Sequence, residues 1–179
     1  MEEKELIKKG KHLSYLLRHD KNYNFDEHGY REIKDLVQNH GYTKHEIELI
    51  VDNNDKQRYE FNSNKTKIRA RQGHSIPINV DLTEAIPPFE LYHGTASRFL
   101  SSIFDNGIKK MNRNYVQLSS DKKTAIDVGK RHGEPVILII DTKKMRDDGI
   151  VFYLSNNNVW LTEFIDKKYI KNIDYDCKT

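Results

Sequence analysis

IPINVDLTEAIPPF, residues 76–89, divides this 179-residue chain into two parts that carry different sequence patterns. The stretch holds three prolines and shows neither helical nor alternating apolar periodicity, which predicts an irregular connection. A chain of this length has room for two small lobes joined at such a connection. We therefore place a boundary inside the stretch and expect an N-terminal lobe of residues 1–85 and a C-terminal lobe of residues 86–179.

The residues before this connection predict three helices followed by a β-hairpin. Apolar residues recur at helical spacing in residues 4–19, 31–40 and 43–51. The third helix begins with Thr43-Lys-His-Glu46, which has the spacing of a capping box. Two short β-like segments, residues 58–61 and 67–71, flank an Asn-Ser-Asn turn. Three helices and a hairpin in this order are typical of a winged helix.

The residues after the connection are rich in strand signals. Strands are predicted at residues 89–93, 115–119, 136–140, 150–154 and 159–161, and helices at residues 97–106 and 121–130. The strands outnumber the helices, and their connections are irregular. This order favours an α+β fold over a doubly wound parallel sheet.

The charges of the chain nearly balance, with 30 Lys+Arg against 27 Asp+Glu and a net charge of +3. This balance excludes a strongly basic nucleic-acid coat protein and an acidic tail. Residues 56–75, however, hold six basic residues and a single acidic one. Lys67, Arg69 and Arg71 lie on one face of the predicted strand. That face is either an anion-binding surface or a solvated sheet edge, and charge alone favours neither.

The chain has one cysteine, Cys177, which excludes internal disulfides and cysteine-based metal sites and is typical of a reducing compartment. The first residues lack the apolar run of a signal peptide, and PVILII, residues 135–140, is too short to span a bilayer. We therefore expect a cytoplasmic protein with no membrane partner. The histidines have no metal-ligand spacing, so no metal site is predicted. No glycine-rich phosphate-binding or dinucleotide-binding motif occurs either.

Three short strings combine hydrogen-bonding side chains with a change of chain direction. LLRHD, residues 16–20, ends the first helix, where Arg and His also serve as simple caps. IRARQGHS, residues 68–75, ends the basic strand in a glycine turn. YHGT, residues 92–95, ends a strand with a glycine that permits close approach of a ligand. Each string taken alone is equally typical of an ordinary helix end or turn.

Together and in this order, the strings closely resemble those of the RNA 2′-phosphotransferases, the KptA or tRNA 2′-phosphotransferase family. The resemblance rests on LSYLLRHD (13–20), KIRARQGHS (67–75), ELYHGT (90–95), VGKRHGEPVIL (128–138) and VWLTEF (159–164). It covers nearly the whole chain. It implies a winged-helix-like lobe that binds RNA, packed on a β-rich, ADP-ribosyltransferase-like lobe that binds NAD.

The resemblance also implies a reaction. The family removes an internal 2′-phosphate from RNA, typically at a tRNA splice junction, and consumes NAD⁺ without a metal. The 2′-phosphate attacks the anomeric carbon of the nicotinamide ribose and expels nicotinamide, which leaves ADP-ribosylated RNA. The ribose 2″-hydroxyl then attacks phosphorus and releases 2′-OH RNA and ADP-ribose 1″,2″-cyclic phosphate. Such an enzyme is expected to act as a monomer.

The family's catalytic set corresponds here to Arg18, His19, Arg69 and Arg131. The resemblance implies that Arg69 and Arg131 clamp the phosphate, because guanidinium forks suit phosphoryl oxygens. Arg18 is expected to contact the phosphate or the transition state, and His19 to contact the phosphate or transfer a proton. The expected NAD-binding residues are His93, Gly94, Thr95, Arg98 and Ser119. Gln72, Gly73, His74 and Ser75 are expected between the lobes, with Arg71 at the RNA backbone or the surface.

Tyr115 and Gln117 stand where many members of the family carry two histidines, which argues against an essential imidazole there. Glu163 is interpreted as a surface carboxylate. Two other functions fit parts of the sequence. A non-catalytic winged-helix RNA binder explains the basic hairpin only. An ADP-ribosyltransferase that acts on protein or on a terminal phosphate of nucleic acid would share the NAD-binding lobe.

Overall fold

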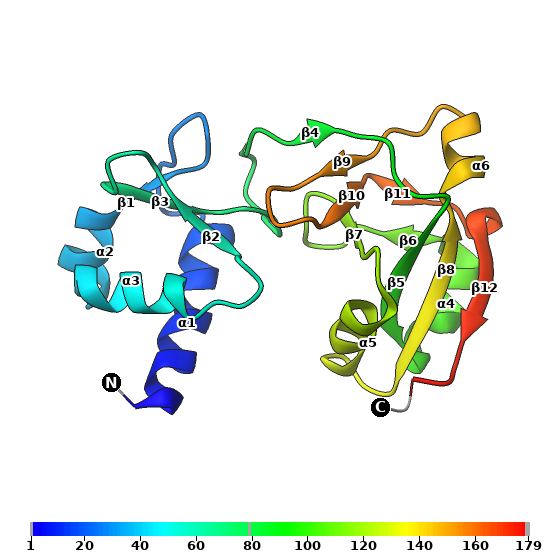
Figure 1. Cartoon of the computed structure of the whole chain (residues 1–179), viewed down its shortest axis with the longest axis horizontal. Helices are drawn as coiled ribbons and strands as arrows, with labels where there is room; N and C mark the ends of the chain where they lie inside the picture. The colour runs from blue at the N-terminus through cyan, green and yellow to red at the C-terminus, as the bar shows by residue number, and fades with distance from the viewer. Residues whose placement is uncertain (1, 79, 178–179) are drawn as a thin grey trace. The chain divides into compact units, whose positions relative to one another are not determined.

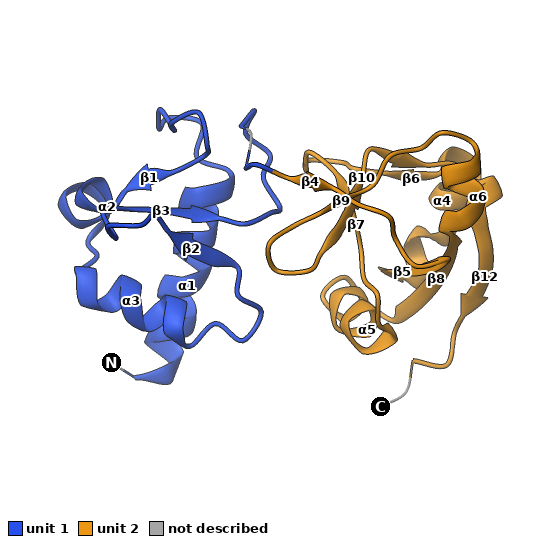
Figure 2. Cartoon of the chain, turned by 45° about the horizontal axis from the view of Figure 1, so that its top comes forward, with its two compact units in different colours: residues 1–81 blue, residues 82–179 orange. Residues whose placement is uncertain are grey.

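The computed structural model describes residues 2–78 and 80–177 and divides into two compact units, residues 1–81 and 82–179 (Figures 1 and 2). The division falls earlier than the predicted boundary after residue 85. The reason is β4 (Thr83–Glu84), which pairs with β9 (Tyr153–Leu154) and so belongs to the C-terminal unit.

The N-terminal unit consists of three helices and a small antiparallel sheet (Figure 1). Its elements are α1 (Glu3–Arg18), β1 (Arg31–Glu32), α2 (Ile33–His40), α3 (Lys44–Asp52), β2 (Tyr59–Phe61) and β3 (Lys67–Ala70). The strand order is β1-β3-β2, and β2 and β3 form the hairpin. The predicted helices and hairpin are confirmed, except that Arg31 and Glu32 pair with β3 instead of starting the second helix.

Local sequence signals set the ends of the helices in this unit. Thr43 accepts a hydrogen bond from the Glu46 amide at 3.1 Å, and the Glu46 carboxylate accepts one from the Thr43 amide at 2.8 Å, which completes the predicted capping box. Gly41 ends α2 in the left-handed conformation, with φ 69°. The apolar faces of the helices and of β3 form one core that includes Leu13, Leu17, Leu36, Ile47, Ile50 and Ile68.

The C-terminal unit combines short antiparallel strands with short helices. β8 (Pro135–Asp141) lies between β5 (Glu90–Ala96) and β12 (Ile170–Asp174), and a second sheet has the order β4-β9-β10-β7. The remaining elements are η1 (Ser97–Phe99), α4 (Leu100–Asn106), β6 (Ile108–Lys109), β7 (Val116–Leu118), α5 (Lys122–Lys130), α6 (Thr142–Asp147), β10 (Trp160–Thr162), β11 (Phe164–Ile165) and η2 (Lys167–Tyr169).

All five predicted strands of this unit overlap observed ones, but β4, β6, β11, β12, α6 and η2 had no sequence prediction. β12 is an edge strand with the sequence IKNID, and two of its five residues are exposed. Such a segment carries no alternation for a periodicity analysis to detect.

Two glycines allow α5 to lie directly against β5. A Cβ atom on Gly94 would stand 1.7 Å from the carbonyl oxygen of Ala125, and one on Gly129 would stand 2.6 Å from that of Thr95. The small size of Gly94 predicts the close approach of a ligand. The structure shows that the helix backbone occupies this space.

The molecule is therefore a mixed α and β protein with small antiparallel sheets, in agreement with the predicted α+β class. Each unit has a core of its own; that of the C-terminal unit includes Leu91, Leu118, Leu138, Ile140, Phe152 and Ile165. Among the described residues, no helix combines the length and the apolar character that a bilayer span requires.

Candidate active site

The end of α1 and the turn after β3 bind to each other in the N-terminal unit. The amides of Ser75 and Ile76 donate to the carbonyl of Arg18, at 3.0 and 3.4 Å. A hydrogen bond of 2.8 Å joins Nδ1 of His19 to the Ser75 hydroxyl and orients the imidazole. A terminal helix carbonyl needs a partner outside the helix, and the turn supplies it. Two strings separated by some fifty residues of sequence therefore form one structural element.

This turn carries three further residues that sequence analysis singled out. Gly73 has a φ of 88°, a left-handed conformation that favours glycine and lets the chain reverse after β3. Gln72 and His74 are both buried, as is Arg18. The N-terminal unit thus brings Arg18, His19 and the QGHS turn together.

A buried arginine that sequence analysis missed fixes the end of α1. The Arg31 side chain is only 2% exposed. Its Nη1 donates to the Leu16 carbonyl at 3.0 Å and to the Asp20 carboxylate at 2.8 Å, and its Nε donates to Asp35 at 2.7 Å. Burial acts to raise the pKa of Asp20, but hydrogen bonds from Arg31 and the Asn22 amide outweigh it and hold the pKa below its ordinary value.

The basic strand β3 is the central strand of its sheet, so its interpretation as a solvated edge is wrong. Lys67 and Arg69 of β3, and Arg71 just beyond its end, each have a carboxylate partner. Lys67 pairs with Asp26 at 3.0 Å, Arg69 with Glu60 at 2.7 Å, and Arg71 with Glu60 at 3.4 Å. These carboxylates relieve the repulsion between like charges on one strand face.

Arg69 makes the most extensive contacts of the three. It is 6% exposed, and its guanidinium also donates to Asp81 at 3.0 Å and to the His28 carbonyl at 2.8 Å, while it stacks on the Tyr30 ring at 4.5 Å. Desolvation acts to lower the pKa of Arg69, but the bonds to Asp81 and Glu60 prevail and raise it. Arg69 therefore ties together three segments of the unit, a structural role that its place in the sequence did not indicate.

His93, on β5, forms a hydrogen bond with β7. Its Nδ1 donates to the Gln117 carbonyl at 3.1 Å, because a carbonyl oxygen only accepts. Desolvation lowers the pKa of His93, His132 lowers it further, and the bond to Gln117 opposes both. The imidazole is therefore neutral near pH 7 and presents the lone pair of Nε2. Gln117 thus contributes its backbone carbonyl to this arrangement.

The other expected NAD-binding residues lie on β5, in η1 directly after it, or just beyond the end of β7. Thr95 is buried beside α5. Ser119 forms an antiparallel bridge with Tyr92, with backbone hydrogen bonds of 2.8 and 2.9 Å, and so holds β7 next to β5. Arg98 is exposed and stacks on the Phe99 ring at 4.6 Å.

Arg131 follows the last turn of α5 and has a cationic neighbour that sequence analysis missed. Desolvation, with repulsion from Arg131, lowers the pKa of Arg113. Arg113 therefore lies within range of the charge on Arg131. The only sequence signal for Arg113 is its position two residues before a predicted strand. Glu163 is exposed, as expected.

Comparison with known proteins assigns these residues to a family. Residues 4–164 match the family described as "RNA 2'-phosphotransferase, Tpt1 / KptA family". A protein of Fusobacterium nucleatum is 47% identical over 92% of this chain and 97% of its own length. One of Flavobacterium johnsoniae is 44% identical over 90% and 93%, and one of Streptomyces coelicolor is 42% identical over 96% and 97%. All three carry the name "Probable RNA 2'-phosphotransferase".

The match covers both units and every catalytic residue that the resemblance implied, from Arg18 to Arg131. The chain belongs to the RNA 2′-phosphotransferase family.

Proposed function

We propose that this protein removes an internal 2′-phosphate from RNA in a reaction that consumes NAD⁺. One observation carries the proposal. In this member of the family, hydrogen bonds join the LLRHD and QGHS strings into one element, which orients His19. In this proposal the N-terminal unit is a winged-helix-like domain that binds the RNA phosphate. The C-terminal unit is an ADP-ribosyltransferase-like domain that binds NAD.

Arg18 and His19 are proposed to hold the 2′-phosphate. A phosphate dianion is already a nucleophile, so the first step needs alignment more than a base. The second step places additional negative charge on phosphoryl oxygens, which guanidinium groups stabilise well. Arg131, with Arg113 beside it, supplies such groups in the C-terminal unit. Arg69 belongs to the proposed clamp as well, in addition to its structural role.

His93 fits an NAD site. Its neutral imidazole accepts a hydrogen bond at Nε2 while the Gln117 carbonyl fixes the tautomer. A ribose hydroxyl is a suitable donor, and the side chains of Thr95 and Arg98 offer a hydroxyl and a cation for the rest of a dinucleotide. When bound, NAD⁺ supplies an electrophilic ribose carbon.

The test is incubation with NAD⁺ and an oligoribonucleotide that bears one internal 2′-phosphate. The expected products are 2′-OH RNA, nicotinamide and ADP-ribose 1″,2″-cyclic phosphate, separated by chromatography. RNA that permanently retains ADP-ribose would instead support a transferase acting on phosphate ends. Binding of RNA without NAD⁺ consumption would indicate a non-catalytic RNA-binding protein.

Arg131→Lys provides a sharper test of the clamp. Lysine retains the charge but not the bidentate fork, so we expect turnover to fall by about a hundredfold. Arg146→Lys, at an exposed position of α6, is the matched control and is expected to leave turnover unchanged. Equal turnover in both variants would remove Arg131 from the proposed mechanism.

A further inference from the structure

A stripe of cationic and aromatic side chains runs along α1 toward His19. Lys4, Lys8, Lys11 and Tyr15 follow one another at intervals of four, three and four residues, which places them on one face of the helix. All four are exposed, and Tyr15 is 54% exposed. The next position on this face is His19, whose ring lies 6.1 Å from that of Tyr15. We call Lys4, Lys8, Lys11 and Tyr15 the α1 stripe.

The lysines of the stripe differ from those elsewhere in the unit that bind carboxylates. Lys9, on another face of α1, pairs with Glu46, and Lys67 pairs with Asp26. Within the part of the chain that the structure describes, Lys4, Lys8 and Lys11 have no ion-pair partner. The acidic residues of α1 stand in its first turn, and none occurs from residue 6 to residue 19.

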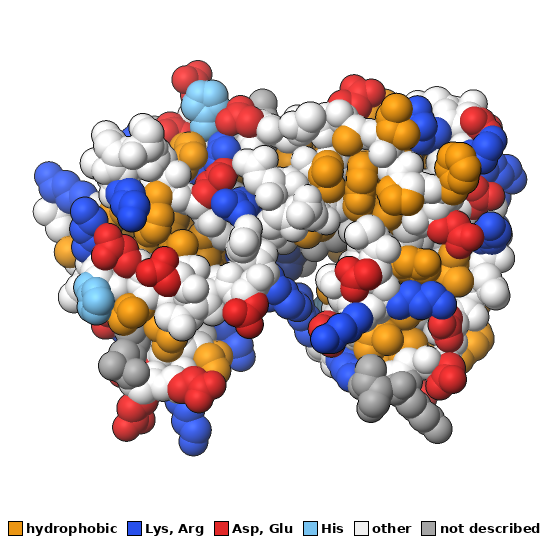
Figure 3. All heavy atoms as spheres, in the orientation of Figure 1, with side chains coloured by type: hydrophobic (Ala, Val, Ile, Leu, Met, Phe, Trp, Pro, Cys, Tyr) orange, Lys and Arg blue, Asp and Glu red, His pale blue; other side chains and the backbone are white. Residues whose placement is uncertain are grey.

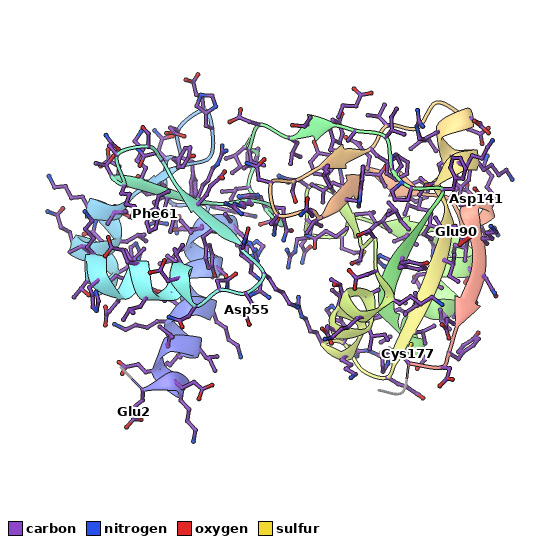
Figure 4. The ribbon with its side chains drawn as sticks, viewed as in Figure 1. Glu2, Asp55, Phe61, Glu90, Asp141 and Cys177 are labelled. Atoms are coloured by element: carbon purple, nitrogen blue, oxygen red, sulfur yellow. The ribbon has the colours of Figure 1, made fainter. Side chains whose placement is uncertain are left out.

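The start of α1 lies beyond the other helices of the unit (Figure 1). The first turns of α1, which follow the labelled Glu2, extend past α3 (Figures 1 and 4). Lys and Arg side chains, with acidic ones at the start of the helix, lie at the surface over α1 (Figure 3).

We propose that the α1 stripe binds the RNA strand that flanks the 2′-phosphate. The lysines are complementary to backbone phosphates, and an exposed tyrosine offers a face on which a base stacks. The stripe also continues directly into Arg18 and His19, the proposed phosphate site. From residue 4 to residue 19 the helix rises about 22 Å, which matches about six phosphates at the spacing of a helical strand. This inference rests on the proposed function and identifies where the enzyme contacts RNA beyond the reacting phosphate.

The experiment compares two substrates and two double variants. One substrate is a trinucleotide with a central 2′-phosphate, and the other is an RNA of about twelve nucleotides with the same centre. The test variant is Lys8→Ala/Lys11→Ala. The matched control is Lys34→Ala/Lys44→Ala, which removes two exposed lysines from α2 and α3 of the same unit.

For the longer RNA, the test variant is expected to have a KM about tenfold higher and an unchanged kcat. This increase in KM is the size expected when two exposed charge pairs are lost. The slope of log kcat/KM plotted against log salt concentration is expected to become shallower by about 1.4. This change corresponds to about 0.7 for each of the two phosphates that no longer bind a lysine. The trinucleotide is too short to reach the lysines, so its KM is expected to stay at the wild-type value. The control variant is expected to match the wild type on both substrates.

Equal KM values for test and control variants on the longer RNA would overturn the inference, as would an equal rise of KM on the trinucleotide. Weaker binding of the test variant to vesicles of anionic lipid, with KM for RNA unchanged, would assign the stripe to a membrane surface instead.

A second measurement, fluorescence anisotropy, follows the binding of the same RNA without its 2′-phosphate. If the wild type turns over neither substrate, the proposed function fails, while the salt dependence of this binding still tests the stripe.

Discussion

The buried guanidinium of Arg31 donates a hydrogen bond to the carboxylate of Asp20, at 2.8 Å, just beyond the end of α1. The same nitrogen donates to the Leu16 carbonyl, so one side chain holds both sides of the segment that carries Arg18 and His19. At a frayed helix end, these two proposed phosphate-binding side chains would lose their orientation. Arg31 is therefore a positioning residue, although it lies outside the strings on which the family resemblance rests.

Replacement of this side chain by an apolar one of similar length tests its role. Arg31→Met leaves Asp20 and Asp35 without their cation in a mostly buried place, so we expect the free energy of unfolding to fall by about 3–5 kcal/mol. Urea denaturation followed by circular dichroism measures this change. Lys34→Met, at an exposed position of α2, controls for the new methionine. A decrease below about 1 kcal/mol would contradict the structural role of Arg31.

Ser75 is expected to affect turnover through His19. Ser75→Ala removes the hydroxyl that orients the imidazole of His19. We expect kcat to fall about tenfold with little change in KM, because a misoriented imidazole would lose part of the rate enhancement that a positioned proton-transfer group contributes. Ser75→Thr retains a hydroxyl and should restore most of the activity. Ser63→Ala, in the exposed turn of the hairpin, is the control. If Ser75→Thr is as slow as Ser75→Ala, the hydroxyl is not what matters.

Two glycine-to-alanine variants should have opposite effects on stability. Gly94→Ala would place a methyl group 1.7 Å from the Ala125 carbonyl oxygen, so α5 must move, and we expect a destabilisation of about 2 kcal/mol or more. Gly10→Ala, within α1, meets only the Ile50 side chain at 3.7 Å and should stabilise the protein by up to about 1 kcal/mol. Thermal denaturation of both variants measures the difference. Equal stability would mean that α5 does not contact β5 as closely as the structure shows.

Arg69 should affect both stability and activity. Arg69→Ala removes the partner of Glu60 and Asp81, so we expect the free energy of unfolding to fall by about 3 kcal/mol. Phosphate removal is expected to slow severely even at temperatures where the variant is fully folded. Arg71→Ala, on the same strand face, should have a smaller effect on both. Normal turnover by folded Arg69→Ala would leave Arg69 a structural role alone.

The low pKa of His93 makes the protein less stable in acid. Desolvation holds this pKa below 6.5 in the folded state, whereas the unfolded chain takes up the proton near pH 6.5. Because the unfolded state then binds more protons, the free energy of unfolding should fall as the pH drops through about 6.5 and level off below the folded pKa. His93→Gln retains an amide donor for the Gln117 carbonyl and should reduce this slope.

Urea denaturation at a series of pH values measures the slope. His45→Gln, at an exposed position of α3, is the control and should leave it unchanged. A wild-type slope in His93→Gln would show that other groups cause the acid sensitivity.

Elements whose signals lie within a few residues of one another were predictable from the amino-acid sequence alone. The capping box at Thr43, the end of α2 at Gly41 and the hairpin around residues 62–64 were all predictable, because their hydrogen bonds join near neighbours in the chain. The ordered strings likewise identified the family. Short and edge strands such as β12 were missed, since their few residues carry no periodic apolar pattern.

The contacts of the candidate residues, in contrast, depend on how distant segments of the chain pack. His19 and Ser75, Arg31 and Asp20, and Arg69 and Asp81 are pairs that no local pattern relates, and folding brings them within hydrogen-bond distance. The small size of Gly94 was visible in the sequence, but its neighbour, the backbone of α5, was not. A residue's type limits the contacts that it is able to make. Which of these contacts it makes depends on the packing of segments distant in the chain, because burial leaves a polar group only the partners that the fold places beside it.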